Sequence, residues 1–117
     1  MNDLKDRTNQ FALRVIRLCA VLPRTGPGEV IGRPLVRSGT SVGAQYREAH
    51  RARSTAEFVS KLECSAQELD ETIYGIELLI DSAIVEQSKL VPLLTEANEL
   101  MAIFVASART ANRNRKG

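Results

Sequence analysis

The amino-acid sequence predicts an all-α protein, folded as an antiparallel up-and-down four-helix bundle. Apolar residues recur at spacings of three, four and seven in four long stretches, turn signals separate these stretches, and none reads as a strand. The 117 residues suffice for one domain. Short connections favour antiparallel neighbours. We expect the bundle to occupy residues 1–111 and a frayed basic tail to occupy residues 112–117.

The first predicted helix covers residues 3–22, with an apolar stripe that includes Phe11, Val15 and Leu18. Pro23 marks its end, and residues 24–28 form a turn.

The second predicted helix covers residues 28–49 and contains Pro34. Proline lacks the N–H that the helical ladder needs and disfavours helical geometry at the preceding residue. We therefore expect a helix that is kinked or restarted near Pro34. Gly39 and Gly43 are four residues apart and share a face, which favours close packing of another helix there, although simple tolerance of glycine remains the alternative.

The third predicted helix covers residues 55–82. Ser54 and Glu57 form a capping box, which is the best boundary signal in the chain. The fourth covers residues 87–111, and Pro92 falls in its first turns, where proline is tolerated.

Charge divides the chain. Residues 1–53 carry ten Lys or Arg against four Asp or Glu, a net +6, whereas residues 54–108 carry two against ten, a net −8. The remaining residues add +4. Such a division can serve contacts within the fold, contacts between subunits or an anionic partner.

The basic residues support two interpretations. Arginine binds phosphate through its planar fork, so an RNA or DNA backbone is one partner. Alternatively, the arginines pair with the acidic third helix, within the subunit or across an interface. The candidate phosphate-binding residues are Arg14, Arg17, Arg33, Arg47, Arg51, Arg53, Arg113, Arg115 and Lys116.

A separate set of residues is a candidate for structural ion pairs. Arg37 and Glu48 share one face of the second helix with Ser41. We expect Arg37, or else Arg47, to form a largely buried ion pair with Glu68 or Glu71 of the third helix, because the two segments carry opposite charge.

Signatures of catalysis are missing from the sequence. There is one histidine, no glycine-rich phosphate loop and no Glu-x-x-His pair for a di-metal site. We expect no enzyme activity, metal site, cofactor or small-molecule substrate. The two cysteines are expected to be reduced thiols. Without a signal peptide or an uninterrupted membrane span, the expected location is the cytoplasm, with no membrane partner.

The run from Gly32 to Ala49, GRPLVRSGTSVGAQYREA, carries a family resemblance. It resembles the signature of a bacterial four-helix-bundle family that includes the proteins encoded in intervening sequences of large ribosomal RNA genes. It is also similar to the accessory variability determinant of diversity-generating retroelements. The resemblance continues to about residue 108. It departs from the family pattern at Pro34, where glutamine is usual, and at Gln45, where asparagine is usual.

The resemblance implies a four-helix subunit that assembles into a ring-like homopentamer. Accessory relatives bind nucleic acid and a reverse transcriptase through a basic surface. The leading hypothesis is thus a non-enzymatic, homo-oligomeric interaction module that binds nucleic-acid phosphates. The alternative is a purely structural, ring-forming oligomer whose opposite charges serve the docking of subunits.

Overall fold

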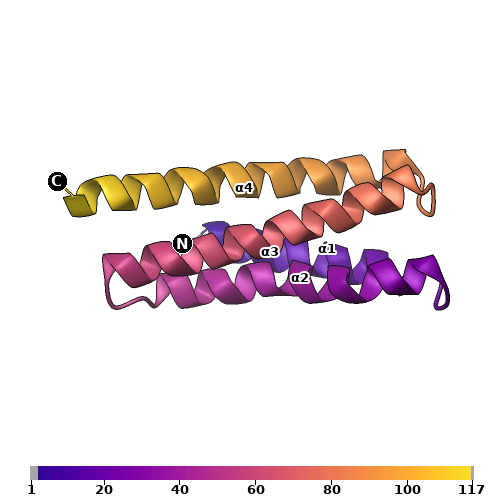
Figure 1. The fold of residues 1–117 in the computed structure, drawn as a ribbon, viewed down its shortest axis with the longest axis horizontal. Coiled ribbons are helices and arrows are strands. Elements are labelled where there is room, and N and C mark those ends of the chain that lie inside the picture. Colours follow the sequence, from indigo (N-terminus) through magenta and orange to yellow (C-terminus); the bar gives the residue numbers. More distant parts are fainter. Residues whose placement is uncertain (1–2, 117) are drawn as a thin grey trace.

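The computed structural model describes residues 3–116, except for the side chains of Arg115 and Lys116. These residues form four helices: α1 (Asp3–Ala20), α2 (Pro27–His50), α3 (Thr55–Asp81) and α4 (Gln87–Lys116). They lie side by side in an elongated bundle of 50 × 24 × 20 Å, with short turns at both ends (Figure 1). The predicted all-α four-helix bundle is confirmed.

The predicted helix starts agree with the structure to within one residue. At the start of α3, Ser54 accepts a hydrogen bond from the backbone N–H of Glu57 at 3.1 Å, as the capping box predicts. The Glu57 carboxylate in turn accepts from the backbone N–H of Arg53 at 3.4 Å. Helix α2 begins at Pro27, directly after Gly26, whose φ of 71° is a conformation that glycine adopts readily.

Helix α2 runs through Pro34 without a break. Of the two alternatives predicted there, the structure therefore excludes a restart. Proline 34 provides no N–H for the carbonyl of Val30, four residues earlier. Val30 and Pro34 are both exposed residues.

Helix α4 extends to Lys116, five residues beyond the predicted end at 111. The predicted boundary between the bundle and a frayed tail at 112 is thus wrong for residues 112–116, which are helical, while Gly117 lies outside the described residues. No glycine or proline follows residue 111 until Gly117, so the chain has no local stop signal at the predicted boundary.

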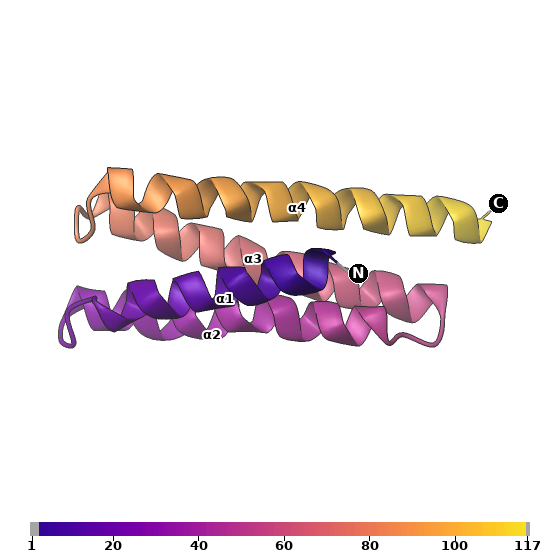
Figure 2. The same cartoon turned by 180° about the vertical axis from the view of Figure 1, so that it is seen from behind.

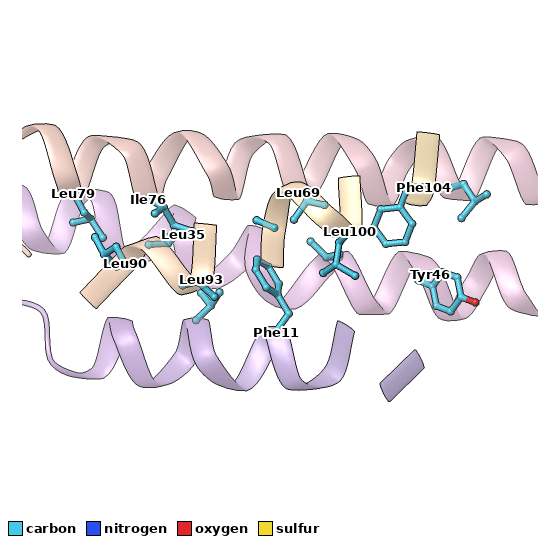
Figure 3. Close-up of a cluster of buried hydrophobic side chains, with 14 of the residues drawn as sticks. Phe11, Leu35, Tyr46, Leu69, Ile76, Leu79, Leu90, Leu93, Leu100 and Phe104 are labelled. Atoms are coloured by element: carbon cyan, nitrogen blue, oxygen red, sulfur yellow. The ribbon is translucent and has the colours of Figure 1, made fainter. Parts of the chain in front are cut away.

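The core is a single cluster of large apolar side chains along the bundle axis (Figure 3). Its fully buried members come from every helix and include Phe11, Leu35, Leu69 and Leu100. Tyr46 of α2 and Phe104 of α4 stack with ring centroids 6.0 Å apart. Burial of this apolar surface is the main contribution to the stability of the bundle.

Buried hydroxyl groups in the core are hydrogen-bonded. Thr72 of α3 lies 2.8 Å from the Ser38 hydroxyl of α2, and Ser65 donates to the carbonyl of Val42 at 3.1 Å. These bonds join α2 to α3 and leave no unpaired hydroxyl among these residues.

Helix α1 is the shortest of the four and begins part-way along the bundle, so the last turns of α4 extend past it (Figure 2). Helix α1 packs closely on α2 but touches α4 at few points. By length and composition alone, α4 could cross a membrane, because an 18-residue window within Gln87–Asn114 has a mean hydropathy of 1.4. Only 28% of this apolar window is buried in the bundle.

Candidate nucleic-acid interface

Glycines on α2 bring α1 and α2 close together. A Cβ atom on Gly39 would lie 2.7 Å from Val15 Cγ1 of α1, closer than carbon atoms approach without displacement. A Cβ atom on Gly43 would lie 3.2 Å from Thr8 Oγ1, which is tight but less severe. Both glycines therefore lie at the helix–helix contact, and any side chain at Gly39 would push α1 away.

A shallow groove of about 270 Å³ lies along this contact on the outside of the bundle. Its floor includes Gly43 and Ala44, and two cationic residues, Lys5 of α1 and Arg47 of α2, line it. The other lining residues are small or polar: Thr8, Asn9, Ala12 and Thr40. A groove with small polar walls and two cations fits an extended anionic backbone.

Arg47 and two further arginines lie at the end of α2 and in the turn that follows. Arg47, Arg51 and Arg53 are all exposed. Among the described residues, no acidic side chain forms an ion pair with any of the three. Their charges are therefore not neutralised by any acidic side chain among the described residues. We call these three residues the α2-end arginines.

Arg33 lies far from this group along α2 and, unlike it, forms an ion pair. It is 14 residues, or about 21 Å of helix, from Arg47. Its guanidinium donates to Glu29 at 2.8 Å across one helical turn, although 81% of its side chain is exposed. Arg33 is accessible but already has an acidic partner.

Arg14 and Arg17, the two candidate phosphate-binding residues on α1, do not form a single group of side chains that faces the groove. Arg14 is nine residues from Lys5, half a rotation around the helix, so it points to the opposite side. It shares that side with Arg7, which bonds to α4. Arg17 is exposed on the outer face of α1.

The C-terminal candidates lie at the same end of the bundle as the α2-end arginines (Figure 1). Arg113 is exposed on α4, and Arg109, which the sequence reasoning did not select, is exposed one turn earlier. The spacing of four residues would have identified Arg109 as a neighbour of Arg113. The side chains of Arg115 and Lys116 lie outside the described residues.

Arg37 joins α2 to α3 through two carboxylates. It donates to Glu68 at 3.2 and 3.3 Å and to Glu71 at 3.3 Å. The expectation of a largely buried ion pair is wrong in its burial, because 57% of the Arg37 side chain is exposed and only Glu68, at 17%, is well covered. The arginine lies at the rim of the α2–α3 contact, so water screens the interaction.

The pKa shifts of Glu68, Glu71 and Arg37 follow from this arrangement. Burial favours the neutral form of Glu68, but the hydrogen bonds from Arg37 and Glu71 lower the pKa of Glu68 below its ordinary value. The hydrogen bond to Glu68 raises the pKa of Glu71, with burial adding to the effect. The pKa of Arg37 is raised, chiefly by its hydrogen bond to Glu68.

Two more ion pairs connect neighbouring helices. Glu48 of α2 accepts from Lys61 of α3 at 2.9 Å, and the pKa of Lys61 is raised by this hydrogen bond. Arg7 of α1 bonds to Glu96 of α4 at 2.6 Å and to Glu99 at 3.3 Å. Sequence reasoning missed Arg7 because its partners lie about 90 residues away and no local pattern connects them.

The remaining reactive groups do not form a recognisable site. In the part of the chain that the structure describes, no three His, Cys, Asp or Glu side chains are placed to hold a metal ion. Cys19 and Cys64 are free thiols. Cys19 lies 3.6 Å from the carbonyl of Gly32, and burial raises the pKa of its thiol, which favours the protonated, unreactive form.

Comparison with known proteins identifies the family. Residues 2–106 match the family described as 23S rRNA-intervening sequence protein. The chain belongs to this family. A crystal structure of a protein of unknown function from the S23 ribosomal protein family of Bacteroides thetaiotaomicron VPI-5482 is similar, with 30% sequence identity and a TM-score of 0.81. The match covers 89% of this chain and 96% of that protein. No curated protein matches the sequence.

Membership of the 23S rRNA-intervening sequence protein family confirms the predicted resemblance over nearly the whole chain. The neighbouring structure has no assigned function. The family match and the similar structure therefore agree with the four-helix fold of this chain.

Proposed function

We propose that this member of the family is a non-enzymatic, self-associating helical-bundle module that binds nucleic-acid phosphates through the α2-end arginines. The observation that carries the proposal is the difference between two groups of arginines. Arg7, Arg33 and Arg37 bond to carboxylates of the same subunit. The α2-end arginines have no such partner among the described residues and are exposed.

The surroundings of these arginines favour contacts to a phosphate backbone over recognition of individual bases. The groove beside Arg47 has small polar walls, and the exposed Tyr74 lies on α3, not in this groove. Recognition of single-stranded bases normally uses aromatic platforms. Contacts to phosphates need only cations in an open groove, so the proposed binding is weakly dependent on sequence.

The self-associating part of the proposal is supported by the family resemblance, which implies a ring-like homopentamer. A purely structural oligomer is the second candidate function, and the division of exposed charge favours it. Asp70 and Glu77 are exposed on α3, while the α2-end arginines are exposed at the end of α2 and in the turn that follows, so unlike surfaces of two copies can attract each other.

Salt-dependent binding separates the two candidates. We expect the protein to bind a ribosomal RNA fragment and duplex DNA in fluorescence-anisotropy titrations at about 50 mM salt, and to lose affinity steeply as salt rises. The plot of log K against log salt has a negative slope. Replacing the three α2-end arginines by alanine should make this slope less steep by about 2–3, because each phosphate contact contributes about 0.7–0.9 to its magnitude.

The matched control is Arg24→Ala, which removes an exposed arginine from the turn at the other end of the bundle. It should leave the slope nearly unchanged. The absence of binding by the unmodified protein to either nucleic acid at low salt would overturn the nucleic-acid role and leave the structural oligomer.

A further inference from the structure

Helix α4 has an outer face without the charges usual on a surface helix. A helix at a protein surface normally carries charged residues opposite its buried stripe. From Val91 to Ala106 the exposed positions of α4 are instead neutral, apart from Glu99, which bonds to Arg7 of α1. Val91 and Val105 are 44% and 39% exposed. The other exposed outer residues are Thr95, Asn98, Ala102 and Ala106.

This face explains why so little of the apolar window of α4 is buried. One side of the helix carries core residues such as Leu90, Leu100 and Phe104, all nearly fully buried. The opposite side carries the half-exposed Val91 and Val105 among small or polar residues, so its apolar atoms remain open to solvent. An apolar face of this kind is typical of a protein–protein contact.

An apolar groove of about 260 Å³ lies on a different side of the subunit, between α2 and α3. Val30 and Tyr74 line it and are 71% and 63% exposed, and Gly75 lets α2 and α3 approach closely there, since a Cβ on it would lie 3.0 Å from Leu35 Cδ1. Pro34 also lines the groove and frees the carbonyl of Val30 as an acceptor.

Apart from Arg37, which lines the groove and is paired with Glu68 and Glu71, the charges beside the two surfaces are opposite. Asp70, Glu77 and Asp81 lie four, three and seven residues from Tyr74, so they share its outer face of α3, and all three are exposed. Among described residues none of the three forms an ion pair. On α4, Arg109 and Arg113 continue the face of Ala102 at offsets of 7 and 11. Each surface thus combines apolar residues with the charge that the other needs.

We propose that the outer face of α4, from Ala102 to Arg113, docks on the α2–α3 groove of a second copy of this chain. The arginines of α4 then lie along the acidic residues beside Tyr74, and Val105 and Ala106 cover the apolar groove. Because the two surfaces are different, the contact is head-to-tail, and each added subunit presents a new groove or a new α4 face. The inference rests on the self-association in the proposed function and names its two surfaces.

The test uses one variant for each surface of the full-length protein. Val105→Glu places a charge on the α4 face, and Tyr74→Glu adds like charge beside the groove. We expect each variant alone to sediment as a folded 12.9 kDa monomer in analytical ultracentrifugation, while the unmodified protein is an oligomer. Circular dichroism should show unchanged helix content, because both positions are exposed.

Mixing the two variants gives the decisive result. The Val105→Glu protein keeps an intact groove and the Tyr74→Glu protein keeps an intact α4 face, so the mixture should form a 1:1 dimer that cannot grow. Val21→Glu, at a valine that is 79% exposed in the α1–α2 turn and outside both surfaces, is the control and should leave the oligomer intact.

Other outcomes overturn the inference and separate it from the proposed function. If the unmodified protein is an oligomer and both variants remain oligomers, or if only Val105→Glu dissociates it, the assigned pair of surfaces is wrong while self-association stands. If the unmodified protein is a monomer, self-association and this inference fail together. The anisotropy titrations measure nucleic-acid binding independently of either result.

Discussion

Helices α1 and α2 approach each other over glycines, whereas helices α3 and α4 are separated by large apolar side chains. On α2, Gly39 and Gly43 face Val15 and Thr8 of α1 at distances that leave no room for a side chain or only just enough. On α4 there is no glycine, and its buried side is a row of Leu, Ala and Phe residues. The same bundle therefore contains one contact limited by the backbone and one filled by side chains.

This difference has a consequence for mutation. The α1–α2 contact is sensitive to added atoms, because there is no space to take them up. The α3–α4 side is sensitive to lost atoms, because each large side chain leaves a cavity when it is shortened. Substitutions on the two sides therefore test the comparison in opposite directions.

The largest expected effect is at Phe104, which is 1% exposed and stacks on Tyr46. Phe104→Ala should lower the free energy of unfolding by about 3–5 kcal/mol, the usual cost of removing a buried phenyl group. Urea denaturation followed by circular dichroism measures this. The matched control is Val91→Ala on the same helix, at a position that is 44% exposed and outside the proposed docking face, which should cost much less. Equal losses for the two variants would show that Phe104 is not part of the packed core.

The second prediction concerns added atoms at the glycines. Gly39→Ala should lower the free energy of unfolding by about 1–2 kcal/mol, because the strain against Val15 exceeds the gain of about 1 kcal/mol in helix propensity. Gly43→Ala, with its nearest contact at 3.2 Å, should be close to neutral. Urea denaturation of both variants gives the comparison, in which each is the control for the other.

A double-mutant cycle shows whether Val15 is the cause. Val15→Ala removes the two methyl groups that lie closest to the position of the added Cβ. The loss in the double variant should then be smaller than the sum of the single losses by at least about 0.5 kcal/mol. Additive losses, or a stabilising Gly39→Ala, would contradict the close approach of α1 and α2.

Sequence periodicity predicted the helices well because each apolar stripe has one buried partner surface. Ser54 and Glu57 fixed the start of α3 through a purely local hydrogen bond, which sequence alone can identify. The end of α4 was predicted too early, because polar residues after Ala111 do not by themselves stop a helix. At Pro34 the sequence predicted either a kink or a restart, and the continuous helix excludes the restart.

The candidate site was predicted less completely than the fold. Opposite charge on consecutive antiparallel helices predicted that Arg37 or Arg47 would pair with Glu68 or Glu71, and in the structure Arg37 bonds to both glutamates. The exposure of Arg37 depends on how far each helix is rotated about its axis. This rotation is set by packing between helices, which no local sequence pattern predicts. The grouping of the α2-end arginines apart from Arg14 likewise depends on the rotation of α1 against α2.

The smallest expected effect is at the rim of the α2–α3 contact, between the two contacts compared above. Arg37→Ala should lower the melting temperature at pH 7 by less than about 4 °C, because exposed ion pairs contribute little. This is a far smaller loss than a buried pair would give. Thermal melts followed by circular dichroism, with Glu68→Gln as the matched variant, measure it.

The effect of Arg37→Ala on stability should depend on pH. The folded protein lowers the pKa of Glu68, so the stability contributed by its carboxylate is present above the ordinary glutamate value of about 4.3 and is lost as the pH falls through the lowered value. Glu71, whose pKa is raised, acts in the opposite direction, because its ionisation as the pH rises opposes folding and reduces the net effect at neutral pH. The difference between the unmodified protein and Arg37→Ala should therefore be present at pH 7 and disappear near pH 3. A difference of the same size at both pH values would mean that Arg37 acts through the packing of its aliphatic stem and not through its charge.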